Sequence, residues 1–208
     1  MSTTIPTGVT STVATRPARL LGLTGIAAGL LWAVLTVWEY QAGLQDGPLI
    51  GARLVNQIGF AIAIAGYVAL LIGVHRARPA GPGRVARAIT GLFAAAWLVI
   101  LAGQLLSLLA DLSGDDNPLL GIGGLLQGVA SLATGIAVAR SGRWSGWQRW
   151  WPLLLALYYV GVLLVPVFAG HEPTMLTESI WAVTYAVLGI ALATATRRAD
   201  AGQRSLPA

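Results

Sequence analysis

Three carboxylates are the side chains of this sequence best placed for chemistry, because each lies at or just inside the end of a long apolar segment: Glu39, Asp111 and Glu178. A carboxylate surrounded by hydrocarbon is energetically costly, so acids in such positions are candidates for function. Paired buried acids can donate and accept protons beside an apolar substrate, which would make these three the catalytic residues of an enzyme. Each also has a simpler interpretation. Glu178 lies about one turn inside a predicted helix, where the helix dipole favours an acid, and Glu39 and Asp111 can end their helices at the membrane interface.

Amides, aromatic residues and one arginine accompany these acids. Arg53 is the only arginine among the acidic loops, so it is a candidate counter-ion for Glu39 or Glu178, or a group that holds an anionic ligand. Gln104 and Gln127 either line a ligand pocket or hydrogen-bond neighbouring helices. The predicted ligand-binding set combines the acids with these and other polar and aromatic groups: Glu39, Arg53, Asn56, Gln104, Asp111, Gln127, Tyr158, Glu178, Trp181 and Tyr185.

Several other kinds of site are excluded or weakly supported. The chain has no cysteine, which excludes disulfides, thiolate catalysis and Cys-ligated metals, and it has no lysine for Schiff-base chemistry. His75 and His171 belong at opposite ends of the predicted helices, so we predict no metal site. Phosphate-binding, metalloprotease and nucleophile-elbow motifs are absent, and we predict no cofactor.

The composition is that of a membrane protein: of 208 residues, 56% are hydrophobic and only 10% are charged. The segment 88–110 carries no charge, and as a helix it would extend roughly 34 Å, enough to cross a bilayer. We predict an all-α, polytopic fold of six transmembrane helices in three antiparallel hairpins, with the fifth helix kinked near Pro166. The expected spans are about 20–38, 54–74, 88–110, 118–139, 151–169 and 174–196. They form one transmembrane domain, 20–196, between a mobile tail at 1–19 and a short tail at 197–208.

The charges predict the orientation of these helices. Twelve of the thirteen arginines fall in the termini and in the even-to-odd loops, whereas seven of the eight acids fall in the odd-to-even loops or at their edges. The positive-inside rule therefore places both termini in the cytoplasm and predicts a multi-pass protein of the plasma membrane. The net charge of +5 is scattered in short clusters between apolar runs, so we predict no binding of nucleic acid. The segment 140–151, rich in arginine and tryptophan, is typical of an interfacial anchor, or alternatively of a lipid-headgroup or partner-helix dock.

Small residues at helical spacing predict which helix faces point inward, since membrane helices approach each other through glycine and alanine. The clearest rows are Gly22, Gly25, Gly29, Trp32, Thr36 and Glu39 on the first span, and Glu178, Ala182, Tyr185 or Ala186, Gly189 and Ala193 on the last. These rows place the candidate polar residues toward the bundle interior, in its outer half. The sequence therefore predicts an outward-opening polar cavity above an apolar floor of small residues.

Three functions fit this prediction. The leading one is a small-solute binding or transport component, and the layout of six spans, cytoplasmic termini and outer cavity resembles substrate-binding subunits of energy-coupling-factor importers. The second is an intramembrane enzyme that uses carboxylates on a lipid or isoprenoid. The third is a non-catalytic assembly or signalling subunit. Expected partners are the lipid bilayer, a small-molecule or lipid ligand, and either a second copy of the chain or another membrane protein, because small-residue rows serve internal packing and dimerisation equally well.

Overall fold

The computed structural model describes residues 16–45, 47–112 and 117–204, the last nine by their backbone alone. Most of the predicted tail at 1–19, the end of the tail at 197–208, and Asp46, Asp115 and Asp116 lie outside the described residues. Residues 16–19 and 197–204, which we assigned to the tails, belong instead to the first and last helices. Pro17 is compatible with this extension, because proline is tolerated in the first turn of a helix.

The described chain is all-helical, and six helices are long and apolar enough to cross a membrane. The first four are α1 (Arg16–Ala42), α2 (Gly51–Ala77), α3 (Arg84–Ala110) and α4 (Pro118–Ser141). A 3-10 turn, η1 (Gly146–Arg149), leads into the fifth span, which joins α5 (Trp151–Tyr158), η2 (Tyr159–Leu164) and α6 (Val165–Phe168). The sixth is α7 (Met175–Arg204). All of these except the fifth span extend past the predicted segments at one end or both, because their end turns continue into the polar flanks.

The fifth span departs from α-helical geometry where the sequence predicts a kink. Residues 159–164 form a π-helix that ends just before Pro166. Proline has no backbone N–H and its ring clashes with the carbonyl four residues earlier, so a wider turn accommodates it without ending the helix.

Glycine brings α1 into close contact with two neighbours. A Cβ atom on Gly29 would lie 2.7 Å from the carbonyl oxygen of Ala182, and one on Gly22 would lie 2.8 Å from that of Gly189. On the opposite partner, Gly66 faces Ala28. Such close backbone approach maximises dispersion contact, which drives helix association in a solvent as apolar as the side chains themselves.

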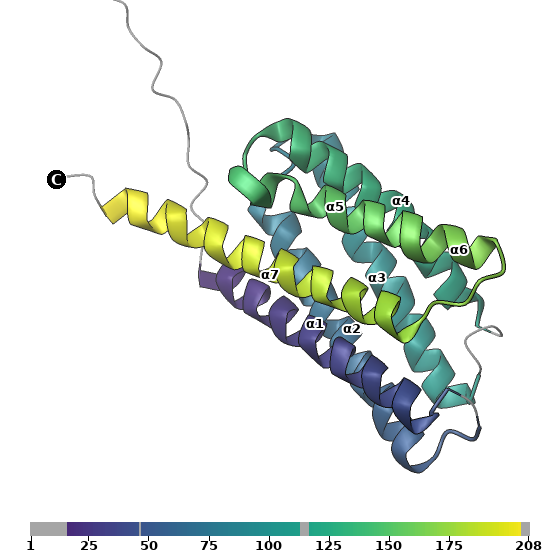
Figure 1. Cartoon of the computed structure of the whole chain (residues 1–208). Coiled ribbons are helices and arrows are strands. Elements are labelled where there is room, and N and C mark those ends of the chain that lie inside the picture. Colours follow the sequence, from purple (N-terminus) through teal and green to yellow (C-terminus); the bar gives the residue numbers. More distant parts are fainter. Residues whose placement is uncertain (1–15, 46, 113–116, 205–208) are drawn as a thin grey trace, which may run out of the picture.

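The helices follow one another around the bundle. Helix α1 packs on α7 and α2, α3 packs on α2 and α4, and the fifth span packs on α4 and less extensively on α7. The start of α1 and the end of α7 lie at one end of the bundle, as Figure 1 shows. We call the opposite end, which carries the turns after α1, α3 and α6, the distal end.

Only half of the tryptophans in the segment 140–151 are exposed. Trp147 and Trp150 are 47% and 50% exposed, and the guanidinium of Arg149 lies 5.2 Å from the ring centroid of Trp150. Trp144 is buried, and the indole of Trp151 donates to the carbonyl of Thr184. The exposed pair is suited to the bilayer interface, whereas the other two join the fold.

The close packing of α1 on α7 predicts a large cost for one methyl group. Gly29→Ala should destabilise the protein by roughly 1–3 kcal/mol, because the new Cβ meets backbone atoms that cannot move aside. The measurement is the unfolding midpoint in a mild detergent. Gly161→Ala is the matched control, since a Cβ there meets no atom within 4 Å. Equal midpoints for the two variants would contradict the packing described.

Candidate functional site

The distal end of the bundle contains a cavity of about 410 Å³ that is lined mainly by polar side chains. We call it the polar cavity. Its walls come from α1, α2, α3, α4 and α7 and from the turn between α1 and α2, and they comprise Glu39, Tyr40, Gln45, Leu49, Arg53, Gln57, Gln104, Ser107, Leu108, Asp111, Leu112, Leu120 and Glu178. A volume of this size is typical of sites for small ligands.

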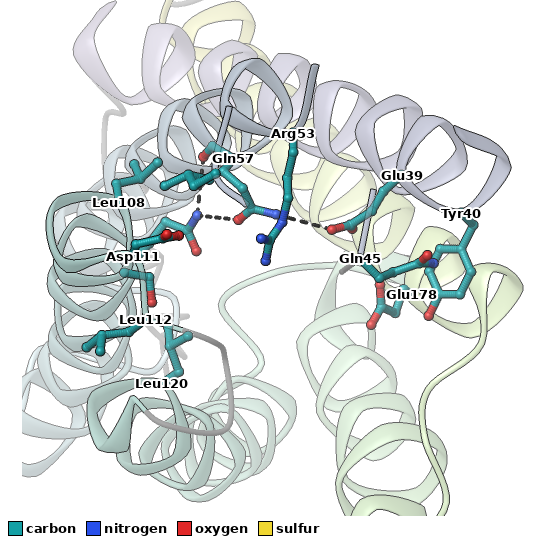
Figure 2. A pocket seen from close by; sticks show the side chains of 13 residues that line it. Glu39, Tyr40, Gln45, Arg53, Gln57, Leu108, Asp111, Leu112, Leu120 and Glu178 are labelled. Atoms are coloured by element: carbon teal, nitrogen blue, oxygen red, sulfur yellow. Dashed lines mark hydrogen bonds between the residues drawn. The ribbon is translucent and has the colours of Figure 1, made fainter. Parts of the chain in front are cut away.

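A chain of hydrogen bonds crosses the wall of the polar cavity from α3 to α1. The amide of Gln104 donates to the side-chain oxygen of Gln57 at 2.9 Å, and the amide of Gln57 donates to the carboxylate of Glu39 at 3.2 Å (Figure 2). Each amide thereby fixes the orientation of the next group. The free oxygen of Gln104 and the second oxygen of Glu39 are acceptors that this chain does not use.

The side chains of Arg53 and Glu178 have no hydrogen bond or ion pair within the described part of the chain. The Arg53 side chain extends toward the middle of the polar cavity, and its buried Nε atom has no acceptor (Figure 2). Arg53 is close enough to Glu39 to act electrostatically on it. Glu178 lies beside Tyr40, whose hydroxyl donates instead to the carbonyl of Pro173 at 2.8 Å. The two charges are therefore available to a ligand.

A second cavity, of about 390 Å³, adjoins the first and is almost entirely apolar. We call it the apolar cavity. It lies among the first half of α4, the fifth span and the start of α7, and its walls are Trp32, Leu120, Gly121, Gly124, Leu125, Tyr159, Leu163, Leu164, Val167, Phe168, Pro173, Glu178 and Trp181. Leu120 and Glu178 line both cavities. Glu178 is the single carboxylate among the residues that line the apolar one.

Aromatic side chains fill the bundle next to the two cavities. Trp97, Tyr67 and Tyr185 are fully buried, with ring centroids 4.5–5.2 Å apart. The ring of Trp181 stacks on that of Trp97 at 5.7 Å, and Trp32 meets Trp181 edge-on at 5.3 Å. The sequence predicts small residues beneath the polar cavity, but the structure places this aromatic core in the interior.

The aromatic core satisfies some of its hydrogen-bond donors and leaves others without an acceptor. The hydroxyl of Tyr185 accepts from the indole of Trp97 at 3.1 Å and from the amide of Gln127 at 3.0 Å. The indole N–H groups of Trp32 and Trp181 are buried and have no acceptor in the described structure. Both of these tryptophans line the apolar cavity. Their indole nitrogens are themselves inaccessible, so the two tryptophans present ring carbons to the cavity.

The structure brings together part of the predicted ligand-binding set. Glu39, Arg53, Gln104, Asp111 and Glu178 line the polar cavity, and Trp181 lines the apolar one.

The other four predicted residues lie away from both cavities. Gln127 and Tyr185 are buried in the core and hydrogen-bond each other. The hydroxyl of Tyr158 donates to the carbonyl of Thr177 at 3.0 Å. Asn56, on α2, is fully buried, and neither of its amide atoms has a partner among the described residues.

Several cavity residues were not among the predicted set. Tyr40, Gln45, Gln57 and Ser107 line the polar cavity, and Trp32 and Tyr159 line the apolar one. Gln57 could have been found, because it follows Arg53 by four residues and so shares its helix face. For Tyr159 the sequence offered two adjacent tyrosines, and spacing alone did not decide which of them faces inward.

The shared hydroxyl of Tyr185 predicts that its removal is costly. Tyr185→Phe leaves two buried donors, on Trp97 and Gln127, without an acceptor, and should lower the free energy of unfolding by roughly 2–5 kcal/mol. Tyr67→Phe is the matched control, because Tyr67 is equally buried but loses only one long bond, 3.5 Å to Ala182. Chemical unfolding in detergent measures both. A Tyr67→Phe protein that is as unstable as Tyr185→Phe would refute this account.

Comparison with known proteins leaves the site to be judged from its own chemistry. No protein family, curated protein or solved structure was found that matches the chain. What the geometry offers is a polar and an apolar cavity that meet at one carboxylate, Glu178.

Proposed function

We propose that the chain is a plasma-membrane protein whose six spans form three antiparallel hairpins, with both termini in the cytoplasm and the distal end outside. The distribution of arginines supports this orientation, because twelve of the thirteen lie in the terminal segments or in or beside the loops that join α2 to α3 and α4 to α5. They are Arg16, Arg19, Arg76, Arg78, Arg84, Arg87, Arg140, Arg143, Arg149, Arg197, Arg198 and Arg204. In this orientation the polar cavity opens to the exterior.

The proposed function is the binding of a small ligand from the outer side, as a small-solute binding or transport component. The observation that carries the proposal is the convergence of Glu39, Arg53, Gln104 and Glu178, from four helices, on one cavity of about 410 Å³. Concave sites with a few converging polar groups are the usual form of ligand-binding sites. Charged groups without direct partners inside a membrane bundle are costly to maintain unless a ligand uses them.

The aromatic core bears on whether the protein binds or transports. Trp97, Tyr67 and Tyr185 are fully buried beside the cavities. A binding component needs only the open cavity, whereas a transporter must also move this core to complete a path. The described arrangement corresponds to an outward-open state of such a cycle.

An intramembrane enzyme is the second candidate, and the apolar cavity favours it. A lipid or isoprenoid chain in that cavity would end beside Glu178, with Glu39 and Asp111 in the adjoining polar cavity. A carboxylic acid there could protonate the substrate, and a carboxylate could accept a proton. Turnover in detergent without any ion gradient would identify an enzyme.

The orientation predicts which loops are accessible from outside the cell. The chain has no cysteine, so single cysteines can be introduced without background. A cysteine replacing the exposed His171 should react with a membrane-impermeant maleimide in intact cells, whereas one replacing Gly83 should react only after lysis. The opposite pattern would place the polar cavity on the cytoplasmic side.

Ligand binding predicts a specific loss with Glu178→Gln. The purified protein should carry a metabolite or lipid detectable by mass spectrometry, and uptake of that compound into vesicles should fall at least about tenfold, because the variant removes the unpaired charge. Glu172→Gln, at an exposed loop position, is the matched control and should retain both the bound compound and its uptake.

Other outcomes assign other functions. Uptake that survives Glu178→Gln would contradict a role for this site. Co-purification with a partner protein that tolerates loss of Glu39 and Glu178 would indicate an assembly subunit instead.

A further inference from the structure

Glu178 has a distinctive position, because it is the single acid shared by the polar and apolar cavities. A ligand that spans the two would carry its charged group at Glu178 and extend its apolar part past Trp181. This geometry suits a molecule with one compact charged end and one apolar body, and it does not suit a uniformly polar solute.

The charge of the polar cavity determines the sign of that end. Its walls hold three carboxylates, on Glu39, Asp111 and Glu178, and one guanidinium, on Arg53. Arg53 acts on Glu39, which also accepts from Gln57. The carboxylate of Glu178 has neither a hydrogen bond nor an ion pair in the described structure, and burial and a second acid, Glu39, both act on it. A cation is therefore the ligand group that this position would attract.

The apolar cavity adds a further requirement. Its rings include Tyr159, Phe168 and Trp181, whose faces attract organic cations and apolar groups alike. Among the residues that line it, Glu178 is the single charged one, so the part of the ligand that lies there is apolar.

The rim of the apolar cavity indicates how such a molecule enters. Leu125, Val167 and Phe168 line the cavity and are also exposed, Phe168 to 70%. They lie on helices of the membrane-spanning bundle, so their exposed surfaces contact acyl chains in a bilayer. An amphiphile dissolved in the membrane can reach the cavity from this side.

From these observations we infer that the ligand is an amphiphilic organic cation: an ammonium group bound at Glu178, joined to an apolar body that lies in the apolar cavity. The inference rests on the proposed ligand-binding function and names its ligand class.

Three probes separate the charge from the apolar body. Hexanoylcholine has the ammonium and an apolar chain, 3,3-dimethylbutyl hexanoate keeps the shape without the charge, and acetylcholine keeps the ammonium and the ester but shortens the apolar chain. Calorimetric titration into the protein in lipid nanodiscs, with empty nanodiscs as the blank, should give hexanoylcholine at least about tenfold tighter than the neutral ester and several-fold tighter than acetylcholine. These comparisons use the native protein and need no variant to fold.

Two variants then assign the preferences to residues. Glu178→Gln should abolish the preference for the charged ester, while Glu172→Gln should retain it. Phe168→Ala removes an exposed ring that lines the apolar cavity, so it should retain the preference for charge and reduce the advantage of hexanoylcholine over acetylcholine. Binding is compared only for variants whose unfolding midpoint equals that of the native protein, so a loss of binding does not reflect a loss of folding.

The failures of the two proposals are distinguishable. Equal or tighter binding of the neutral ester, or a preference for charge that persists in Glu178→Gln, overturns the cationic ligand. If the probes do not bind but a different compound co-purifies and is lost in Glu178→Gln, the cationic ligand is overturned and the ligand-binding function stands. If no compound co-purifies, no probe binds and uptake is indifferent to Glu178, both fall.

Discussion

The close approach of α1 to α7 and α2 is the constraint on which the rest of the structure depends. Gly22, Gly29 and Gly66 remove the side chains that would hold these backbones apart, so the helices meet closely through glycine and alanine between residues 22 and 29 of α1. Toward the distal end the same face of α1 carries Trp32, Thr36 and Glu39, which are larger and more polar. The helices are joined tightly where residues are small, and the cavities lie where the residues become large.

The aromatic core explains why the cavities end where they do. Tyr185 gives Trp97 and Gln127 a common acceptor, so three polar groups are buried with their hydrogen bonds made. Trp32 and Trp181 belong to the same ring cluster, yet their indole N–H groups are without acceptors next to the apolar cavity. Asn56, Thr36 and Thr134, which line neither cavity, also have buried polar atoms without a partner in the described structure, so an unsatisfied polar atom does not by itself mark a ligand site.

Much of this architecture could be predicted from the sequence, because membrane spans depend on local hydropathy and packing faces depend on the spacing of small residues. Five predicted polar residues, Glu39, Arg53, Gln104, Asp111 and Glu178, line one cavity for this reason. Spacing shows that a side chain faces inward but not what lies opposite it. Gln127 and Tyr185 face inward and meet each other, whereas Gln104 meets Gln57 at the cavity wall. Pro166 predicted an irregularity in the fifth span but not its π-helical form, and the apolar cavity depends on packing between distant helices, which the sequence pattern did not reveal.

The central claim is that glycine-mediated packing leaves a water-filled polar cavity at the distal end and a closed core below it. The reactivity of two engineered cysteines tests it most directly, because Ser107 lines the polar cavity and Ser131 is 1% exposed in the interior. Serine to cysteine is a conservative change, and the natural chain contributes no thiol. We predict that Ser107→Cys reacts rapidly with a water-soluble, membrane-impermeant thiosulfonate, and that Ser131→Cys does not react while the protein is folded. Equal reactivity at the two positions, or protection of Ser107→Cys, would contradict the account.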